Sequence, residues 1–129
     1  EKIDQVIACI QATKLPPDPQ NRIQEVLCDA DTLHLGKKKF SEKNDLLRME
    51  WERQKGSPLS ETEWLNKTID FMSQHKFHTK YAIVEYNPRK SKNLLMLQDE
   101  LRDVMEEQTT KDAKLQEKKA KLLKEEKDL

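Results

Sequence analysis

The chain has 129 residues, with 24 basic and 24 acidic side chains, and charged residues make up 37% of it. Hydrophobic residues account for only 35%, so we expect one modest core with much helical surface facing water. A net charge of zero provides no field to attract duplex nucleic acid or an anionic membrane, and the longest apolar run, residues 94–97, is too short to cross a bilayer. With only two glycines, the composition favours an all-α fold.

A first amphipathic helix is predicted to run up to about Thr13. Its apolar residues repeat at i, i+3, i+4 and i+7, and they are Ile3, Val6, Ile7 and Ile10. The prolines of segment 15–19 then end the helix, because Pro lacks a backbone N–H. Asn21 suits the N-cap of a second helix, and Gly36 suits its end in a left-handed conformation.

The second helix is predicted to place a carboxylate on its apolar stripe. Ile23, Leu27 and Asp31 fall at i, i+4 and i+8, so Asp31 is expected to face the interior beside the first helix. Asp29 is expected on a more polar flank. A carboxylate taken out of water costs several kcal/mol unless it is paired, hydrogen-bonded or bound to metal. Asp31 therefore needs a partner.

Two further helices are predicted in the middle of the chain. The third covers about residues 41–56. The fourth begins with a capping box, Ser60 with Glu63, and a hydrophobic staple, Leu59 with Trp64. These local signals define the start of the fourth helix.

The last third of the chain is predicted to be one long helix. Segment 81–86 could form a strand or a helix by composition, and its helical surroundings favour the helix. Asn87 and Pro88 suit the N-cap and first position of the long helix. Leucines then keep a seven-residue spacing, interrupted only by Gln108, at positions 94, 101, 115, 122 and 129. The companion positions Lys111 and Lys118 are charged, so we expect either a single helix or a weakly self-associating one.

The cysteines and tryptophans are assigned to packing. Cys9 and Cys28 lie among apolar residues, which predicts reduced thiols in a protein of the cytoplasm, with a disulfide as the less favoured alternative. Trp51 and Trp64 lie beside Leu and Met at packing intervals, and we expect both to anchor the core.

Segment 28–36, which reads Cys-Asp-Ala-Asp-Thr-Leu-His-Leu-Gly, resembles the last metal-ligand segment of the HD-domain phosphohydrolases. Segments 8–14, 47–52, 63–65 and 75–79 are similar to a bacterial HD branch. Some members of that branch precede a membrane segment of the type found in cyclic-nucleotide-responsive antiviral effectors. The resemblance implies the C-terminal part of an HD-like helical bundle over residues 1–97, followed by a charged helical extension or connector over residues 98–129.

By this resemblance, Asp31 matches the family's fourth metal ligand and is the expected catalytic residue. The implied cofactor is a divalent metal, Mn, Fe, Zn or Mg, whose bound water attacks phosphorus. The family's early His and adjacent His-Asp pair have no counterpart, because His34, His75 and His78 all lie downstream. We therefore expect the chain to be the C-terminal part of a longer protein, with an incomplete site and a potential link to a membrane segment outside this chain.

Several other residues are weaker site candidates. Asp29 either orients a ligand or bound water or is an exposed helix residue, and His34 is either a substrate contact or a packed histidine. His75 and His78 could share a metal if the helix extends that far, although a phosphate contact is the favoured role. Candidates for anion binding are Thr13, Lys14, Arg48, Lys80 and Arg89.

The predicted function is therefore hydrolysis of a phosphate ester of a nucleotide or cyclic nucleotide. The alternatives are a regulatory module that binds a nucleotide without turnover and a helical scaffold or dimerisation element. The expected partners are a phosphorylated small molecule and, weakly, a second copy of the chain.

Overall fold

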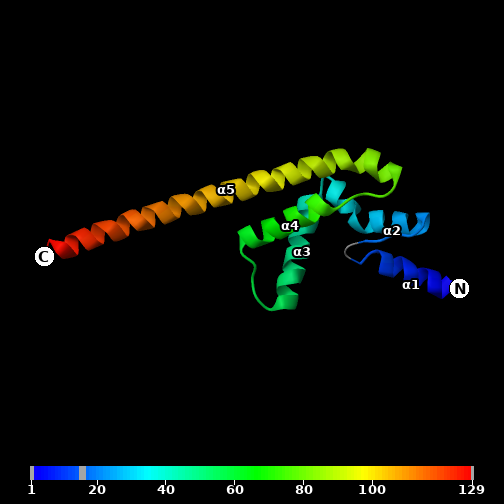
Figure 1. Ribbon diagram of the computed structural model, residues 1–129, viewed down its shortest axis with the longest axis horizontal. Coiled ribbons are helices and arrows are strands. Elements are labelled where there is room, and N and C mark those ends of the chain that lie inside the picture. The colour runs from blue at the N-terminus through cyan, green and yellow to red at the C-terminus, as the bar shows by residue number, and fades with distance from the viewer. Residues whose placement is uncertain (1, 15–16, 129) are drawn as a thin grey trace.

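The computed structural model describes residues 2–14 and 17–128, and these are helical apart from turns and short connections, with no strand among them (Figure 1). The elements are α1 (Lys2–Ala12), α2 (Arg22–Thr32), a 3-10 turn η1 (Leu33–Gly36), α3 (Phe40–Lys55), α4 (Glu61–Gln74) and α5 (Lys80–Lys127). The all-α prediction is confirmed. None of the described helices combines the length and apolar character needed to cross a membrane.

The core is small and lies where α4 and η1 pack against the first half of α5. Its buried members are Leu35, Phe40, Leu65, Met72 and Leu97. Partly buried side chains that extend it include Leu101 and Val104 of α5. Asn93, also on α5, donates hydrogen bonds to the carbonyl oxygens of Leu35 and Lys37, at 2.8 and 3.0 Å. The turn η1 is thus fixed to α5 by packing and by hydrogen bonds.

Gly36 does not end α2 in a left-handed conformation, so that prediction is wrong. Among the described residues, the only positive φ is that of Gly56, at 72°. Gly36 is instead a point of close approach, since a Cβ there would overlap the carbonyl oxygen of Tyr86 and stand 2.7 Å from the Tyr86 Cβ. The absence of a side chain lets η1 lie directly on α5.

The helix α5 begins earlier than predicted. Segment 81–86 is helical, as expected, but the N-cap is Thr79, whose Oγ1 accepts a 3.2 Å hydrogen bond from the N–H of Ala82. Pro88 therefore lies inside α5 and does not open it. Pro inside a helix removes one backbone hydrogen bond. The turn η1 packs on α5 next to this point, with Gly36 against the backbone of Tyr86, two residues before Pro88.

The helices α1 and α2 lie against each other, as expected, but their apolar stripes are not buried. The exposed residues of these stripes are Ile3, Val6, Ile7, Ile10, Ile23 and Leu27. The two helices join near the C-terminal end of α1, where the Cys28 thiol donates a 3.2 Å hydrogen bond to the carbonyl oxygen of buried Ala12. The buried residues of α2 are Gln24, Cys28 and Asp29. Asp31 is exposed, contrary to expectation.

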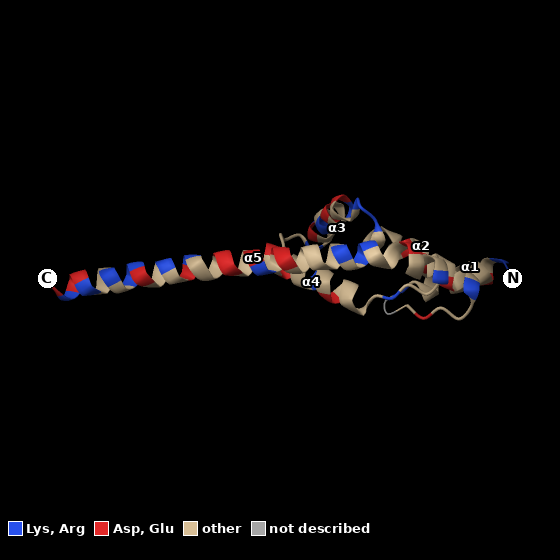
Figure 2. Ribbon diagram, turned by 90° about the horizontal axis from the view of Figure 1, so that it is seen from above, with Lys and Arg blue, Asp and Glu red and all other residues tan. Residues whose placement is uncertain are grey.

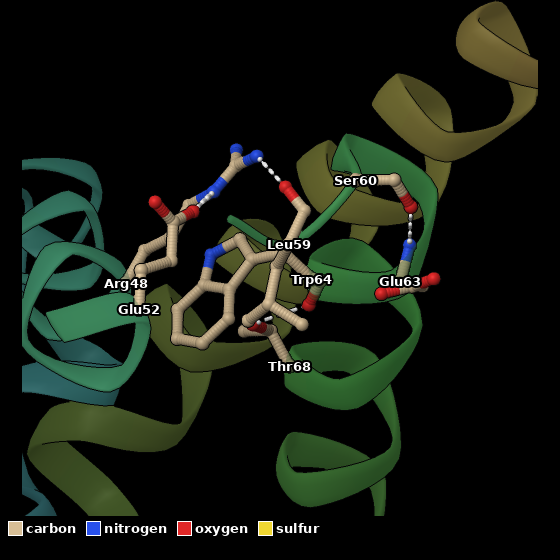
Figure 3. Close-up of polar contacts among 7 residues, drawn as sticks. All are labelled: Arg48, Glu52, Leu59, Ser60, Glu63, Trp64 and Thr68. Atoms are coloured by element: carbon tan, nitrogen blue, oxygen red, sulfur yellow. Dashed lines mark hydrogen bonds and ion pairs between the residues drawn. The ribbon is translucent and has the colours of Figure 1, made fainter. Parts of the chain in front are cut away.

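The predicted helix starts are largely correct. Asn21 Oδ1 caps α2 through the N–H of Gln24 at 2.9 Å, and Ser60 Oγ caps α4 through the N–H of Glu63 at 3.1 Å. Figure 3 shows how Arg48 joins α3 to this region, with hydrogen bonds to Glu52 Oε1 at 2.9 Å and to the carbonyl oxygen of Leu59 at 2.7 Å.

Trp51 is not a core anchor. It is 39% exposed, and the ammonium groups of Lys55 and Lys67 lie 5.1 and 5.2 Å from its ring centroid. Trp64 is half-buried. Both cysteines are free thiols, and burial raises the pKa of Cys28.

The second half of α5 projects away from the other helices (Figure 1). All side chains of residues 105–128 are exposed. The division expected at residue 97 falls within this one continuous helix.

Candidate functional site

One cavity collects most of the candidate residues predicted from the sequence. It has a volume of about 340 Å³ and lies between α2, the end of α4 and the segment after α1. Its polar lining consists of Thr13, Asp31, Thr32, Gln74, His75, Lys76 and His78. The fold thus brings Thr13, Asp31, His75 and His78 together from three separate parts of the chain.

Asp29 does not line this cavity, but it is hydrogen-bonded to the loop that carries His78. It is 4% exposed, and its Oδ1 and Oδ2 accept hydrogen bonds from the backbone N–H groups of His78 and Thr79, each at 2.8 Å. A carboxylate with both oxygens so engaged is compatible with burial. Asp29 is therefore not an exposed helix residue. It fixes the loop that presents His78.

His75 is linked to α2 through a short hydrogen-bond chain. Its Nε2 lies 2.7 Å from the Thr32 Oγ1, and that hydroxyl donates to the carbonyl oxygen of Cys28 at 3.1 Å. Because the Thr32 hydrogen is already used, we assign the proton of the pair to His75 Nε2. Among the described residues, no hydrogen-bond partner is found for the buried His75 Nδ1. This nitrogen is then an acceptor that a ligand or water could use.

His75 is held neutral at ordinary pH. Burial is the main cause that lowers its pKa to about 4, and the positive charge of Lys90 contributes. The Lys90 ammonium donates a 2.7 Å hydrogen bond to the His75 carbonyl oxygen, and burial lowers the pKa of Lys90. The His75 ring meets the edge of Phe77 at a centroid distance of 4.6 Å.

The helix does not extend far enough to align His75 and His78 on one face. The helix α4 ends at Gln74, His75 is its C-cap, and the next three residues are not helical. The two histidines still line one cavity, but the loop conformation brings them there, not helical spacing. Aromatic packing and the Asp29 hydrogen bonds keep the chain extended at this point.

Besides Asp29, five predicted site residues lie outside this cavity. His34 lines a separate hollow with Trp51 and Trp64, stacks on Phe40, and has a pKa lowered by burial and by Lys43. Arg48 is hydrogen-bonded to Glu52 and to the Leu59 carbonyl oxygen. Lys14, Lys80 and Arg89 do not line the cavity.

Thr32, Gln74 and Lys76 line the cavity but were not predicted as site residues. Lys76 lies between the predicted site residues His75 and His78 in the sequence, and this position could have identified it. Thr32 follows Cys28 by one helical turn, where a Thr hydroxyl commonly bonds to the backbone carbonyl of i−4. Nothing in the sequence pairs it with His75.

The described residues do not make a complete metal site. Within residues 2–14 and 17–128, no group of three or more His, Cys, Asp or Glu side chains could hold a metal ion. Asp31 offers one exposed carboxylate at the cavity. A metal there would need ligands from elsewhere.

No family model, curated protein or solved structure matches the chain. The resemblance of segment 28–36 to the HD-domain phosphohydrolases therefore stays a prediction that depends on its motifs.

Proposed function

We propose that this chain contributes one metal ligand, Asp31, and a phosphate-ester subsite to a metal-dependent phosphohydrolase acting on a nucleotide or cyclic nucleotide. The observation that supports this most is the position of Asp31, which lies exposed at the cavity lined by Thr13, His75 and His78. Asp31 and these three residues are all site candidates on the sequence alone.

The chemistry of the cavity lining suits a phosphate ester. Lys76 and His78 supply N–H donors, and the amide of Gln74 adds another. Asp31 is the one acidic side chain of this lining, and its carboxylate repels a phosphate unless a cation lies between them. A divalent metal bound in part by Asp31 removes that repulsion. Its other ligands would be residues outside this chain.

A second candidate function is nucleotide binding without hydrolysis. It is favoured by the lack of a three-ligand group among the described residues. In this alternative, Lys76 and His78 bind the phosphate, and Asp31 contacts a hydroxyl or amino group of the nucleotide.

Metal content and activity of the complete gene product separate the two functions. We expect a bound divalent metal and turnover of a nucleotide phosphate ester with added Mn. Asp31→Asn should lose both, with a fall in activity of at least about 100-fold. Asp70→Asn, at an exposed position on α4, is the matched control and should change neither. Metal-loaded protein that turns over no nucleotide would reject the hydrolase proposal.

Binding to this chain alone tests the subsite separately. Nucleoside mono- and diphosphates should shift the NMR signals of the 75–79 loop, and Lys76→Gln or His78→Gln should weaken binding. His34→Gln removes a histidine from the other hollow and should leave binding unchanged. Signal changes centred on His34 would place the ligand elsewhere and contradict the proposed subsite.

A further inference from the structure

The projecting half of α5 changes charge along its length. In residues 99–107 five side chains are acidic and one is basic, whereas in residues 111–124 six are basic and two are acidic. Figure 2 shows Asp and Glu in red and Lys and Arg in blue along this part of the helix. The acidic and basic segments therefore carry opposite net charges of four each.

Part of this charge lies on a single flank of the helix. Steps of three or four residues keep side chains on one face, and they connect the acidic positions 100, 103 and 107 to the basic positions 111, 114, 118 and 121. The two halves meet at Glu107 and Lys111, whose side chains form a 3.4 Å ion pair. We call these seven positions, from 100 to 121, the charged flank.

An apolar row runs beside the charged flank. Leu97, Leu101 and Val104 belong to this row and pack against the core. Leu115 and Leu122 continue it at helical spacing but are 52% and 60% exposed. The row that packs against α4 in the first half of α5 is therefore left uncovered in the second half.

We infer that a second copy of this chain covers the projecting half of α5 in antiparallel orientation. When residue i of one copy lies opposite residue 221−i of the other, Glu100 faces Lys121, Asp103 faces Lys118 and Glu107 faces Lys114. The two-fold axis produces each pair twice. Leu115 and Leu122 then approach the end of the other copy's apolar row.

A parallel pair fits the same surface poorly. With the two helices in register, the acidic segment of one copy lies beside the acidic segment of the other, and basic lies beside basic. Like charges opposed in this way are destabilising. The antiparallel arrangement also places the two globular parts at opposite ends of the paired helices.

Sedimentation equilibrium at about 50 mM and about 1 M salt tests the pairing, because the Debye length falls to roughly 3 Å at the higher concentration. We expect a monomer–dimer equilibrium whose dissociation constant rises at least about tenfold with salt. The triple change Lys114→Glu, Lys118→Glu and Lys121→Glu should abolish it. The triple change Arg102→Glu, Lys124→Glu and Lys127→Glu alters the net charge equally off the charged flank and should leave a dimer.

Orientation is measured with a spin label on Ala120→Cys, in a background of Cys9→Ala and Cys28→Ser. An antiparallel pair in this register separates the two labelled positions along the axis by about 28 Å, at 1.5 Å per residue, whereas a parallel pair brings them within about 10 Å. A short distance would overturn the proposed orientation. A monomer at millimolar concentration in low salt would overturn the dimer itself, and neither result bears on the cavity.

Discussion

The backbone N–H of Thr79 donates a 2.8 Å hydrogen bond to Asp29 Oδ2, joining residues that are fifty positions apart in the sequence. Thr79 is also the N-cap of α5. One buried carboxylate on α2 therefore fixes both the start of the longest helix and the loop that presents His78 to the cavity.

Removing this carboxylate should destabilise the fold. Asp29→Ala leaves two N–H groups, those of His78 and Thr79, without their acceptor, and we expect the free energy of unfolding to fall by about 3 kcal/mol. Asp31→Ala, at an exposed position two residues away, should change it by no more than about 0.5 kcal/mol. Urea unfolding measures both. Equal losses for the two variants would show that Asp29 has no special structural role.

The two glycines should respond differently to replacement by alanine. Gly36→Ala forces a Cβ into the Tyr86 backbone, so η1 must move off α5 at an expected cost of about 3 kcal/mol. Gly56→Ala meets no atom within 4 Å and costs only its unfavourable φ of 72°, about 1 kcal/mol. Thermal unfolding of both variants measures which substitution costs more stability. A smaller loss at Gly36 than at Gly56 would contradict the close packing described here.

The pKa of His75 predicts a pH dependence of stability. Its pKa is about 4 in the folded protein and 6.5 ordinarily, so between these pH values the unfolded chain binds a proton that the folded chain does not. Stability from this group is complete above pH 6.5 and is lost as the pH falls toward 4. We expect a loss of about 2 kcal/mol, after allowance for partial solvent contact.

His75→Gln is the control for this pH dependence, because a Gln amide can donate to Thr32 without titrating near neutral pH. Its unfolding free energy should vary less between pH 6.5 and 4, with the remaining slope including His34, whose pKa is also lowered. An NMR titration that gives His75 a pKa near 6.5 would refute the burial argument.

Truncation after Met105 should leave the globular part almost unchanged in stability. The last partly buried residue of α5 that packs on the core is Val104, and all side chains from 105 to 128 are exposed. We expect a change below about 1 kcal/mol in dilute, monomeric protein. A loss of more than about 2 kcal/mol would show that the tail packs on the core.

Features that depend only on neighbouring residues could be predicted from the amino-acid sequence. The N-caps Asn21 and Ser60 were predictable because a side-chain oxygen reaches an N–H three residues along the same chain. The all-helical class followed from apolar periodicity and scarce glycine. Four of the ten predicted site residues line one cavity, because Thr13, Asp31, His75 and His78 lie near helix ends that the fold brings together.

Which carboxylate of α2 is buried depends on the packing of distant segments. An apolar stripe of three residues does not fix the rotation of a short helix, and the donors of the distant 78–79 backbone select Asp29 over Asp31. The same holds for α5, which continues through Pro88 against its local preference where η1 packs on it. The His75 bond to Thr32 spans 43 residues. Such contacts depend on where whole helices pack, and no local pattern encodes that.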